Sequence, residues 1–532
     1  MKKNKIVIAA FIALAVLQVR TTTAQQLVKL TPILEVEDTI AGAQLGGIVK
    51  GVGDLNHDGY ADVAVSAPGL FKTYIYYGGK TMSRTPSLTL KGGGQIVSGD
   101  FRGNGWIDLA IEKVNHDTVF VYFNGPNGLD TIPDLVLTVP SVTFGERMTA
   151  GDYFGNGYTD LAIQTFDAYG PSTLQGRGRI FIYAGGPFMN STPVDTIAGD
   201  APWAGLGYDL ASGDVTGNGK DDIVALGYNQ LGGTPQSSYY YISVFGADPA
   251  SQMKRICYID ARHVPGGFGG VGGSGSVACF DADGDGIPDI LVSGICIFKG
   301  GAKIDTLPTY RVGPPRGDTT DYGAFPWVAG GGDYNGDGIP DILLASERGA
   351  FGVTSGVFVM VDGIDDPGQF AGYRVYAQMD PTADLSGNPE NAGDVNGGGV
   401  DDIIIGNGGW FPFVDYGFFG IYSGDTSMKA QNNPLPILPK EMKLEQNYPN
   451  PFNPTTTIIY QLSAVSHVTV RIYDTLGREV ITLVNNEEES PGTYTVHWNG
   501  TNREGERISS GVYFYQLETD NGTQTKKAVF LK

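Results

Sequence analysis

The sequence predicts an all-β protein, a seven-bladed β-propeller followed by a small Ig-like β-sandwich. Three observations lead to this prediction. A nine-residue pattern, Asp-x-x-x-x-Gly-x-x-Asp, recurs seven times, with its first aspartates 46 to 67 residues apart. The 79 glycines and 30 prolines suit many short strands joined by tight turns. A proline-rich stretch at residues 434–440 separates the repeats from a shorter segment with its own strand pattern.

Each copy of the pattern is followed by β-branched and aromatic runs broken by glycine, which predicts four strands per repeat. Repeats of this length are typical of units that bury their faces only by stacking on their neighbours. Seven four-stranded antiparallel sheets around one axis leave few open edges. In chain order the copies are DLNHDGYAD from Asp54, DFRGNGWID from Asp100, DYFGNGYTD from Asp152, DVTGNGKDD from Asp214, DADGDGIPD from Asp281, DYNGDGIPD from Asp333 and DVNGGGVDD from Asp394.

The seventh repeat offers no clear fourth strand after FFGIYSG, which ends at Gly424. A matching segment stands at the other end of the chain, where TPILEV from Thr31 aligns with TPSLTL from Thr85 and TPVDTI from Thr192. We therefore predict that residues 30–37 complete the seventh blade and close the ring.

The acidic loops have the pattern of a calcium site. Oxygen ligands at positions 1, 3, 5, 7 (a backbone carbonyl) and 9, with glycine at position 6, suit a hard cation. Carboxylates about 4 Å apart repel by roughly 4 kcal/mol per pair at an effective dielectric of 20, so a cation stabilises such a loop. The predicted ligands of the three strongest loops are Asp54, Asn56, Asp58, Tyr60 and Asp62 in blade 1; Asp281, Asp283, Asp285, Ile287 and Asp289 in blade 5; and Asp333, Asn335, Asp337, Ile339 and Asp341 in blade 6.

The other four loops depart from the pattern. Blades 4 and 7 keep only some of the ligands. In blade 2, Arg102 stands at position 3, where its guanidinium is expected between Asp100 and Asp108 in place of the cation. In blade 3 the same position is Phe154, which cannot ligate. The remaining candidate ligands are Asp214, Asn218 and Asp222 in blade 4 and Asp394, Asn396 and Asp402 in blade 7.

These repeats resemble the FG-GAP family, the calcium-binding repeats of integrin α-chain propellers and of many bacterial surface proteins. The resemblance covers about residues 30–425, and Phe144-Gly145 before blade 3 keeps the motif after which the family is named. It implies that Ca²⁺ has a structural role here and that ligands bind elsewhere on the propeller. Any single degenerate copy remains open to the simpler reading of an Asp/Asn-Gly hairpin.

The C-terminal segment predicts a β-sandwich with Trp498 and Tyr513 in its core. Its motifs LEQNYPNPFNPTTTI from Leu444, LGREV from Leu476 and SSGVYFYQL from Ser509 are similar to the type A sorting domain of the type IX secretion system. The resemblance implies a Bacteroidota-like Gram-negative source, and the type IX secretion machinery as a partner. The predicted domains are a signal peptide at 1–24, the propeller at 25–425, a linker at 426–444 and the sandwich at 445–532.

The N-terminus reads as a secretory signal, with three lysines, an apolar run over residues 6–19 and a small-residue cleavage site ending at Ala24. We expect a secreted or outer-surface monomer without a membrane span. The formal charge of −22 argues against nucleic-acid binding. The three cysteines are expected to be small core residues, with room for one disulfide bridge.

No residue pattern predicts catalysis. None of the five histidines lies near a nucleophile motif, and Arg-Gly-Asp at 316–318 is better explained by chance in a chain rich in glycine and aspartate. We favour a non-enzymatic binding protein for a glycan or a surface protein; the alternative is a polysaccharide-active lyase or hydrolase. Either function is expected on the long connections at 165–178, 227–239 and 406–416, because loops on a propeller face carry recognition.

Overall fold

A computed structural model describes residues 31–531 except 38–39, 41, 115–116, 140–142, 167–175, 202, 231–237, 265–267, 269–274, 294–295, 312–326, 337, 339, 347–355, 362–373, 377–388, 408–416, 425–441, 463–465, 490–491, 504 and 521. The predicted signal peptide, the Arg-Gly-Asp triplet, Asp337, Ile339 and His116 lie outside the described residues, as does much of the three long connections. No helix within the described residues is long and apolar enough to cross a bilayer.

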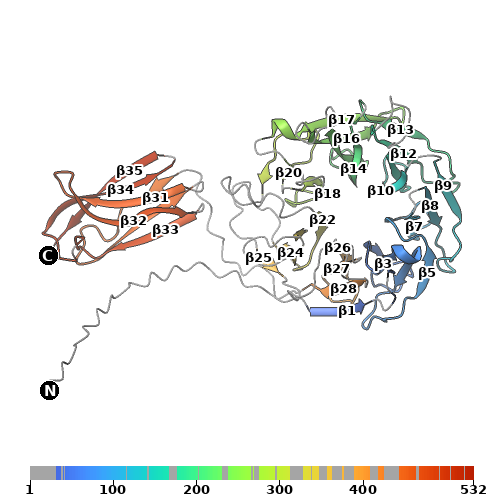
Figure 1. Cartoon of the computed structure of the whole chain (residues 1–532), viewed down its shortest axis with the longest axis horizontal. Coiled ribbons are helices and arrows are strands. Elements are labelled where there is room, and N and C mark those ends of the chain that lie inside the picture. The colour runs from blue at the N-terminus through green and yellow to red at the C-terminus, as the bar shows by residue number, and fades with distance from the viewer. Residues whose placement is uncertain are drawn as a thin grey trace, which may run out of the picture.

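The first 28 strands form seven four-stranded antiparallel sheets arranged around a ring (Figure 1). Each inner strand contacts the inner strands of the blades on both sides, and the last of them, β26, contacts the first, β2. The inner strands of blades 1 to 7 are β2 Val49–Gly53, β6 Ile96–Gly99, β10 Thr143–Gly151, β14 Leu206–Gly213, β18 Val277–Phe280, β22 Trp327–Gly332 and β26 Pro389–Gly393. The predicted propeller is confirmed.

The second strand of every blade begins at the ninth-position aspartate of its acidic loop, so each loop joins an inner strand to the strand beside it. The second strands are β3 Asp62–Ala67, β7 Asp108–Glu112, β11 Asp160–Phe166, β15 Asp222–Gln230, β19 Asp289–Val292, β23 Asp341–Ser346 and β27 Asp402–Asn407. The third strands are β4 Lys72–Tyr76, β8 Thr118–Tyr122, β12 Arg179–Tyr183, β16 Ser238–Ala247, β20 Cys296–Phe298, β24 Gly356–Val361 and β28 Phe418–Ser423.

The outer strands are shorter and often follow a proline. They are β5 Leu88–Lys91, β9 Leu135–Thr138, β13 Asp195–Ala198, β17 Met253–Asp260, β21 Tyr310–Arg311, β25 Arg374–Tyr376 and, in blade 7, β1 Thr31–Glu37. Two 3₁₀ turns, Pro68–Leu70 and Ala261–His263, follow strands of blades 1 and 4.

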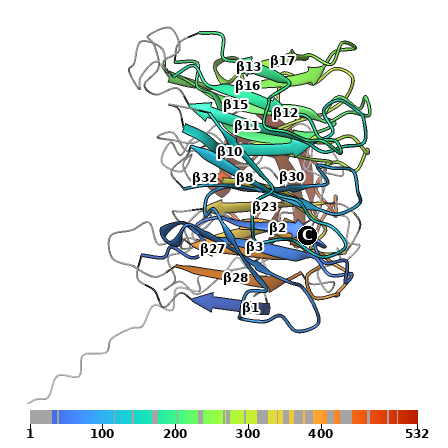
Figure 2. The same cartoon turned by 90° about the vertical axis from the view of Figure 1, so that its right-hand side faces the viewer.

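The N-terminal strand closes the ring, as the sequence predicted. Strand β1 pairs antiparallel with β28, with Glu35 opposite Gly420, and the two lie side by side in Figure 2. Leu34 is buried in a core shared by blades 7 and 1. In the same core the rings of Tyr76 and Phe419 lie 5.0 Å apart between centroids. The first and last blades are therefore joined by apolar burial in addition to the backbone pairing of β1 with β28.

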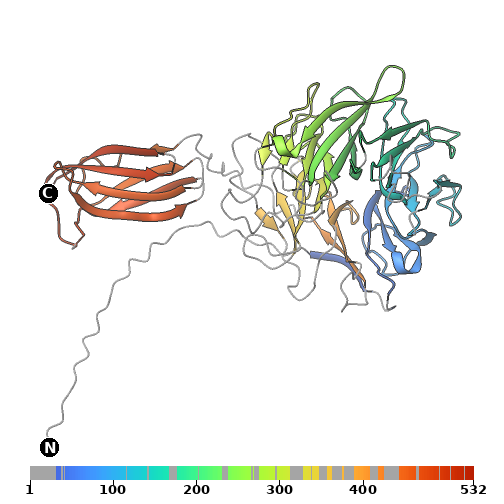
Figure 3. The same ribbon diagram turned by 45° about the horizontal axis from the view of Figure 1, so that its top comes forward.

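The C-terminal part is a two-sheet sandwich (Figure 3, orange to red). One sheet contains β29 Lys443–Leu444, β30 Thr456–Leu462 and β33 Gly492–Trp498. The other contains β32 Glu479–Glu489, β31 Ser466–Tyr473, β34 Gly511–Thr519 and β35 Gly522–Phe530. Trp498 and Tyr513 are both buried and pack edge to face with ring centroids 5.5 Å apart, which confirms the predicted core pair.

Candidate metal loops and a candidate binding surface

The first aspartate of each acidic loop organises the turn. In all seven loops it accepts a hydrogen bond from the amide of the sixth-position glycine, at 2.7 to 2.9 Å. In blade 1, Asp54 also accepts from the amide of Asp58 at 3.1 Å. The sixth glycine has a positive φ in every loop, for example +89° at Gly59, which favours glycine there.

The ninth aspartate of each loop is buried and bonded to backbone. In blade 1, Asp62 accepts from the amides of Leu55 and Gly78, each at 2.8 Å. In blade 5, Asp289 accepts from Ala282 at 3.1 Å and Gly300 at 2.8 Å. This carboxylate therefore ties the loop to the glycine turn that follows the third strand of its own blade.

Burial disfavours the ionised form of these ninth-position carboxylates. It raises the pKa of Asp62, Asp160 and Asp402 to about 7, against the hydrogen bonds that lower it. It raises the pKa of Asp108, Asp222 and Asp289 to about 6. The carboxylates at positions 5 and 1 of the same loop, Asp58 and Asp54, add to the rise at Asp62 by charge repulsion. A bound cation would reverse this effect by favouring the ionised form.

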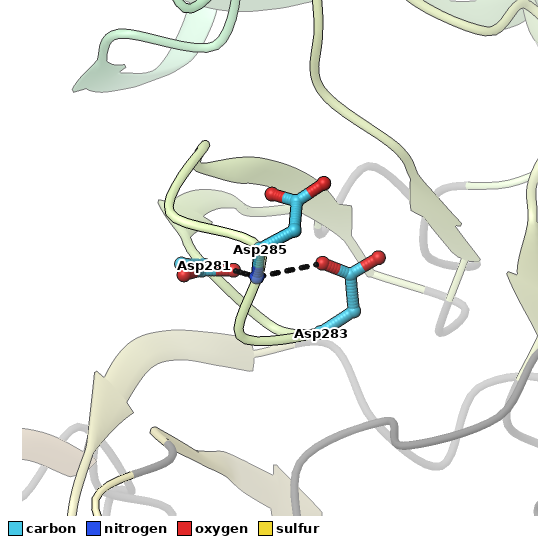
Figure 4. A group of neighbouring side chains, drawn as sticks. All are labelled: Asp281, Asp283 and Asp285. Atoms are coloured by element: carbon cyan, nitrogen blue, oxygen red, sulfur yellow. Dashed lines mark hydrogen bonds between the residues drawn. The ribbon is translucent and has the colours of Figure 1, made fainter.

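Blade 5 has the strongest cluster of acidic ligands. Asp281, Asp283 and Asp285 place one carboxylate oxygen each within 4.8 Å of the others, the only such group of three acidic side chains or more in the described residues (Figure 4). The amide of Asp285 donates to Asp281 at 3.1 Å and to Asp283 at 3.3 Å. The donor set suits a hard cation, although Asp289 is directed to backbone amides and lies outside the trio.

A lysine already lies in this cluster. The Lys299 ammonium bonds to Asp283 and lies 2.9 Å from Asp285 Oδ2. Lys299 follows strand β20, ten residues beyond the acidic loop, so the nine-residue pattern gave no sign of it. The antiparallel pairing of β19 with β20 brings Lys299 back to the acidic loop of its own blade.

Blade 1 combines the same loop geometry with no internal cation. Asn56 donates to Asp58 Oδ2 at 3.0 Å, and the amide of Asp58 donates to Asn56 Oδ1 at 2.9 Å. Within the described part of the chain, no lysine or arginine lies within ion-pair distance of Asp54, Asp58 or Asp62. The oxygen donors at positions 1, 3 and 5 therefore fit a hard cation here as well.

Blades 6 and 7 keep an asparagine at position 3 that faces the ninth aspartate. Asn335 is fully buried and donates to Asp341 at 3.3 Å. Asn396 donates to Asp402 at 3.1 Å. In blade 7 position 5 is Gly398, whose amide bonds to Asp394 at 2.9 Å, so that loop has one side-chain ligand fewer.

The three other loops fill position 3 in different ways. In blade 4 the Thr216 hydroxyl donates to Asp222 at 2.9 Å, while Asn218 accepts from Lys220 at 2.9 Å. In blade 3, Phe154 packs against the apolar core between blades 3 and 4. Neither arrangement adds a carboxylate to the loop.

In blade 2, Arg102 lies 3.6 Å from Asp108 Oδ1, bonds to the carbonyl of Asn124 and sits 4.6 Å from the centroid of the Phe123 ring. The predicted replacement of the cation by arginine is therefore found on the Asp108 side of the loop.

The loops also contact one another around the ring. At four joints the seventh residue of one loop packs on the fourth-position glycine of the preceding loop. These contacts are Tyr158 on Gly103, Lys220 on Gly155, Ile287 on Gly217 and Tyr60 on Gly397. In blade 1 the fourth residue is His57, whose ring stacks on Trp106 of blade 2 at 3.8 Å and 7°. Glycine at the fourth position of the other six loops was the signal for this packing, and sequence reasoning missed it.

Backbone bonds reinforce these contacts. The amide of the eighth residue donates to the carbonyl of the first aspartate in the preceding blade at four joints. These bonds are Ala61 to Asp394, Thr159 to Asp100, Asp221 to Asp152 and Asp401 to Asp333, at 3.0 to 3.1 Å. In blades 5 and 6 the eighth residue is proline, which has no amide hydrogen to donate.

The inner strands carry two charged pairs. Lys50 on β2 lies 2.8 Å from Glu390 on β26, and Arg147 on β10 lies 3.4 Å from Asp209 on β14. Burial raises the pKa of Asp209, while Glu390 raises the pKa of Lys50. In both pairs the two charges come from neighbouring blades.

Blade 4 presents aromatic rings and arginines on its third strand β16, its outer strand β17 and the 3₁₀ turn that follows. We use the name blade 4 aromatic row for Tyr239, Tyr258, Arg255 and Arg262. The Arg262 guanidinium lies 3.6 Å from the centroid of the Tyr239 ring, and the Arg255 guanidinium lies 5.4 Å from that of Tyr258. Buried Tyr241 lies beneath, with its ring stacked on Tyr258 at 5.3 Å.

Two acidic residues hold the arginines of the row. Asp260 accepts from Arg262 at 3.0 and 2.6 Å, and Asp200 accepts from Arg255 at 2.6 Å. Trp203, 40% exposed, stands next to Ala204, whose carbonyl accepts from the hydroxyl of Tyr241. The surface therefore combines flat apolar rings with fixed hydrogen-bonding groups.

The described histidines and cysteines form no catalytic group. His263 lies 3.7 Å from Asp260 in blade 4, and His467 lies 3.1 Å from Asp520 on the sandwich surface. His497, also on the sandwich, contacts Thr457. All three cysteines (Cys257, Cys279 and Cys296) are free, so the bridge that the sequence left open is not formed.

Comparison with known proteins supports the reading of the repeats. Residues 51–80, which contain the blade 1 loop, match the FG-GAP repeat family. The match covers one of the seven repeats. Residues 452–523 match the FlgD Ig-like domain.

Phosphatidylinositol-glycan-specific phospholipase D of Rattus norvegicus is 26% identical to this chain over 220 residues, 41% of this chain and 22% of that protein. Integrin alpha-5 of Xenopus laevis is 34% identical over 165 residues, 25% of this chain and 15% of that protein. The chain spans less than a quarter of the length of these relatives.

Many solved structures also align with this chain, PorZ and a rhamnogalacturonan lyase among them. PorZ, a bacterial surface component of the type IX secretion system of Porphyromonas gingivalis, aligns over 90% of this chain and 74% of its own, with 11% identity and a TM-score of 0.22. The rhamnogalacturonan lyase YesX aligns over 80% and 73%, with 12% identity and a TM-score of 0.34.

Proposed function

We propose that this chain is a secreted or surface-located binding protein, a calcium-braced propeller that holds a glycan against the blade 4 aromatic row. The row is the single observation that carries the proposal. Tyr258 is 38% exposed and the Arg262 side chain is 50% exposed, although both take part in ordered contacts.

The chemistry of the row suits a pyranose chain. Sugar rings present C–H faces that pack on aromatic rings, and their hydroxyl groups bond to side chains that are already fixed in direction. Arg262 is fixed by Asp260 and by the Tyr239 ring, so little side-chain entropy is lost when it binds a hydroxyl. The partly open rings and the paired charges together favour a glycan over a purely apolar ligand.

Calcium has a bracing role in this proposal. The acidic trio of blade 5 and the oxygen donors of blade 1 support cation binding, and the loops contact one another around the ring. A cation in a loop would offset carboxylate repulsion and stabilise the joints between blades. Asp54, Asn56 and Asp58 are the blade 1 residues that would hold it.

A second function, polysaccharide cleavage, is favoured by the charged pairs of the inner strands. Burial raises the pKa of Asp209, and a raised carboxyl pKa is one mark of a catalytic acid. Its pairing with Arg147 and its bond from the amide of Val277 argue instead for a structural role. Binding is therefore the preferred function.

A glycan array tests the proposal directly. The full chain should retain a subset of glycans, and Tyr258→Ala should weaken that binding about tenfold, because one aromatic contact is worth roughly 0.5–1.5 kcal/mol beyond burial. Phe188→Ala removes an aromatic residue that is 88% exposed on blade 3 and should leave binding unchanged. Release of shorter sugars from a bound glycan would establish the enzyme instead.

We also propose that the C-terminal sandwich directs export through the type IX secretion machinery, on the basis of the sorting-domain motifs. Removal of residues 443–532 should leave the propeller inside the cell envelope in a type IX-competent bacterium. Cell fractionation would measure this, and secretion of the truncated chain at the full-length level would contradict it.

A further inference from the structure

The acidic loop of blade 5 contains a cation that belongs to the protein. Lys299 contacts two of the three carboxylates that would hold a metal, Asp283 and Asp285. Asp283 is nearly buried, with 8% of its side chain exposed, so its charge has little access to water. The ammonium thus occupies the side of the cluster where a cation would neutralise most charge.

Other blades have a position that corresponds to that of Lys299, but the residue at this position differs from blade to blade. This position precedes the residue whose amide bonds to the ninth aspartate, as Gly300 does to Asp289. The same position is Tyr77 in blade 1, Phe123 in blade 2, Ala184 in blade 3 and Ser423 in blade 7, each identified by the same bond to its own ninth aspartate. Only blade 5 among these five places a charged residue there.

Comparison with blade 2 shows what makes Lys299 different. Arg102 also brings a positive charge to a loop, but it is held by the Asn124 carbonyl and the Phe123 ring in addition to Asp108. Within the described residues the Lys299 ammonium has partners only in the acidic cluster, and 37% of its side chain is exposed. A flexible, hydrated ammonium can leave such a site more readily than a stacked guanidinium can.

We propose that Lys299 is a displaceable counter-ion: it neutralises the blade 5 loop when calcium is absent, and calcium enters the loop only by moving it into solvent. The inference rests on calcium binding by the loops, as proposed above. Calcium binding in blade 5 then depends on the displacement of Lys299, so blade 5 is the conditional site. This holds although its loop has the most carboxylates. Blade 1, which has no internal cation, then fills at lower calcium concentration.

The test is a pair of measurements on the full chain after removal of divalent ions. Calcium alone is titrated by calorimetry, and thermal unfolding is followed with chelator and with saturating calcium. Lys299→Met keeps the aliphatic stem and removes the charge. Lys303→Met, an exposed lysine in the same turn, is the matched control.

Lys299→Met should tighten one calcium site roughly tenfold, because two ion pairs no longer compete with the metal. Adding Asp283→Asn should abolish that gain and so assign it to blade 5. Lys299→Met alone should unfold at a lower temperature than the wild type in chelator, and at the same or a higher temperature in calcium. Lys303→Met should show neither change.

The proposal is overturned if Lys299→Met leaves both the calcium affinities and the midpoint in chelator at wild-type values. It is also overturned if calcium binds more weakly, because Lys299 would then support the site. A chain that binds no calcium in any variant contradicts the proposed calcium brace, whereas binding to blade 1 with no effect of Lys299 contradicts only this inference.

Discussion

The backbone amide of Ala61 donates a 3.0 Å hydrogen bond to the carbonyl of Asp394, which fastens the acidic loop of blade 1 to that of blade 7. The two residues are 333 positions apart and meet only because the ring closes. Strand β1 makes the second closure when it pairs with β28. The propeller is thus closed at the loops and at the outer edge, in addition to the Lys50–Glu390 pair of the inner strands.

Loss of apolar contact at this closure should destabilise the whole ring. We expect Leu34→Ala to lower the free energy of unfolding by about 2–4 kcal/mol, because Leu34 is 4% exposed in the core between blades 7 and 1. Chemical denaturation measures this. Glu37→Ala, on the same strand but exposed, is the control; an equal loss in both would contradict a packing origin.

A fourth-position glycine that lies against the next loop should not tolerate a side chain. A Cβ at Gly103 would lie 2.4 Å from the ring of Tyr158, and its φ is +66°. We expect Gly103→Ala to cost about 2–4 kcal/mol, from strained backbone and forced overlap. Denaturant midpoints would measure it.

Gly105→Ala separates the cost of backbone strain from the cost of overlap with a neighbouring ring. Gly105 has φ +83° with nothing within 4 Å, so only backbone strain, about 1 kcal/mol, is expected there. Adding Tyr158→Ala to Gly103→Ala should remove the overlap and part of the loss. Equal effects at both glycines would show that the contact between loops is unimportant.

The hydroxyl of Thr216 should contribute more to the stability of the fold than its methyl group does. It donates to the buried carboxylate of Asp222 at 2.9 Å. Thr216→Val keeps the shape and removes the donor, so we expect a loss of about 1–3 kcal/mol. Thr216→Ser should restore most of it. Thermal unfolding compares the three chains, and a stable valine variant would rule out this bond as a support of blade 4.

The blade 3 loop predicts a pH dependence that calcium should not remove, because Phe154 replaces a ligand there. Burial raises the pKa of Asp160 to about 7, above its unfolded value. Its contribution is therefore fully present below about pH 4 and is lost as the pH rises through 7.

We expect the chain to be less stable at pH 8 than at pH 5, with Asp160 contributing at most roughly 4 kcal/mol. Urea denaturation at both values, with calcium present, measures the slope. Asp160→Asn should reduce the difference between the two pH values. An unchanged slope in that variant would assign the dependence to other groups.

Much of the fold could be predicted because its signals are local. The nine-residue pattern contains both the turn and the first residue of the next strand, and alternation fixes the strands around it. Closure by residues 31–37 was predictable because the seventh repeat lacked a strand that the N-terminus supplied. Trp498 and Tyr513 were predictable as the large rings of a short alternating segment.

The remaining features depend on neighbours that are distant in the chain. Lys299 reaches the blade 5 acids only because the sheet folds back, and the contact of Tyr158 with Gly103 crosses between blades. The blade 4 aromatic row needs the unusual length of β16, 10 residues, and of β17, 8 residues, neither of which a short repeat pattern specifies. The ligand roles of the aspartates stay predictions.

The prolines at position 8 of blades 5 and 6 bear on how the ring carries mechanical load. Under the function proposed above the ring is pulled by a surface polymer, and a closed ring opens first at its weakest joint. Pro288 and Pro340 leave the joints before blades 5 and 6 without the amide bond found at four others. Among the described residues, the joint between blades 1 and 2 also lacks that bond, but there His57 stacks on Trp106. Under tension the ring should therefore part first on either side of blade 5, the blade for which we propose a conditional cation site.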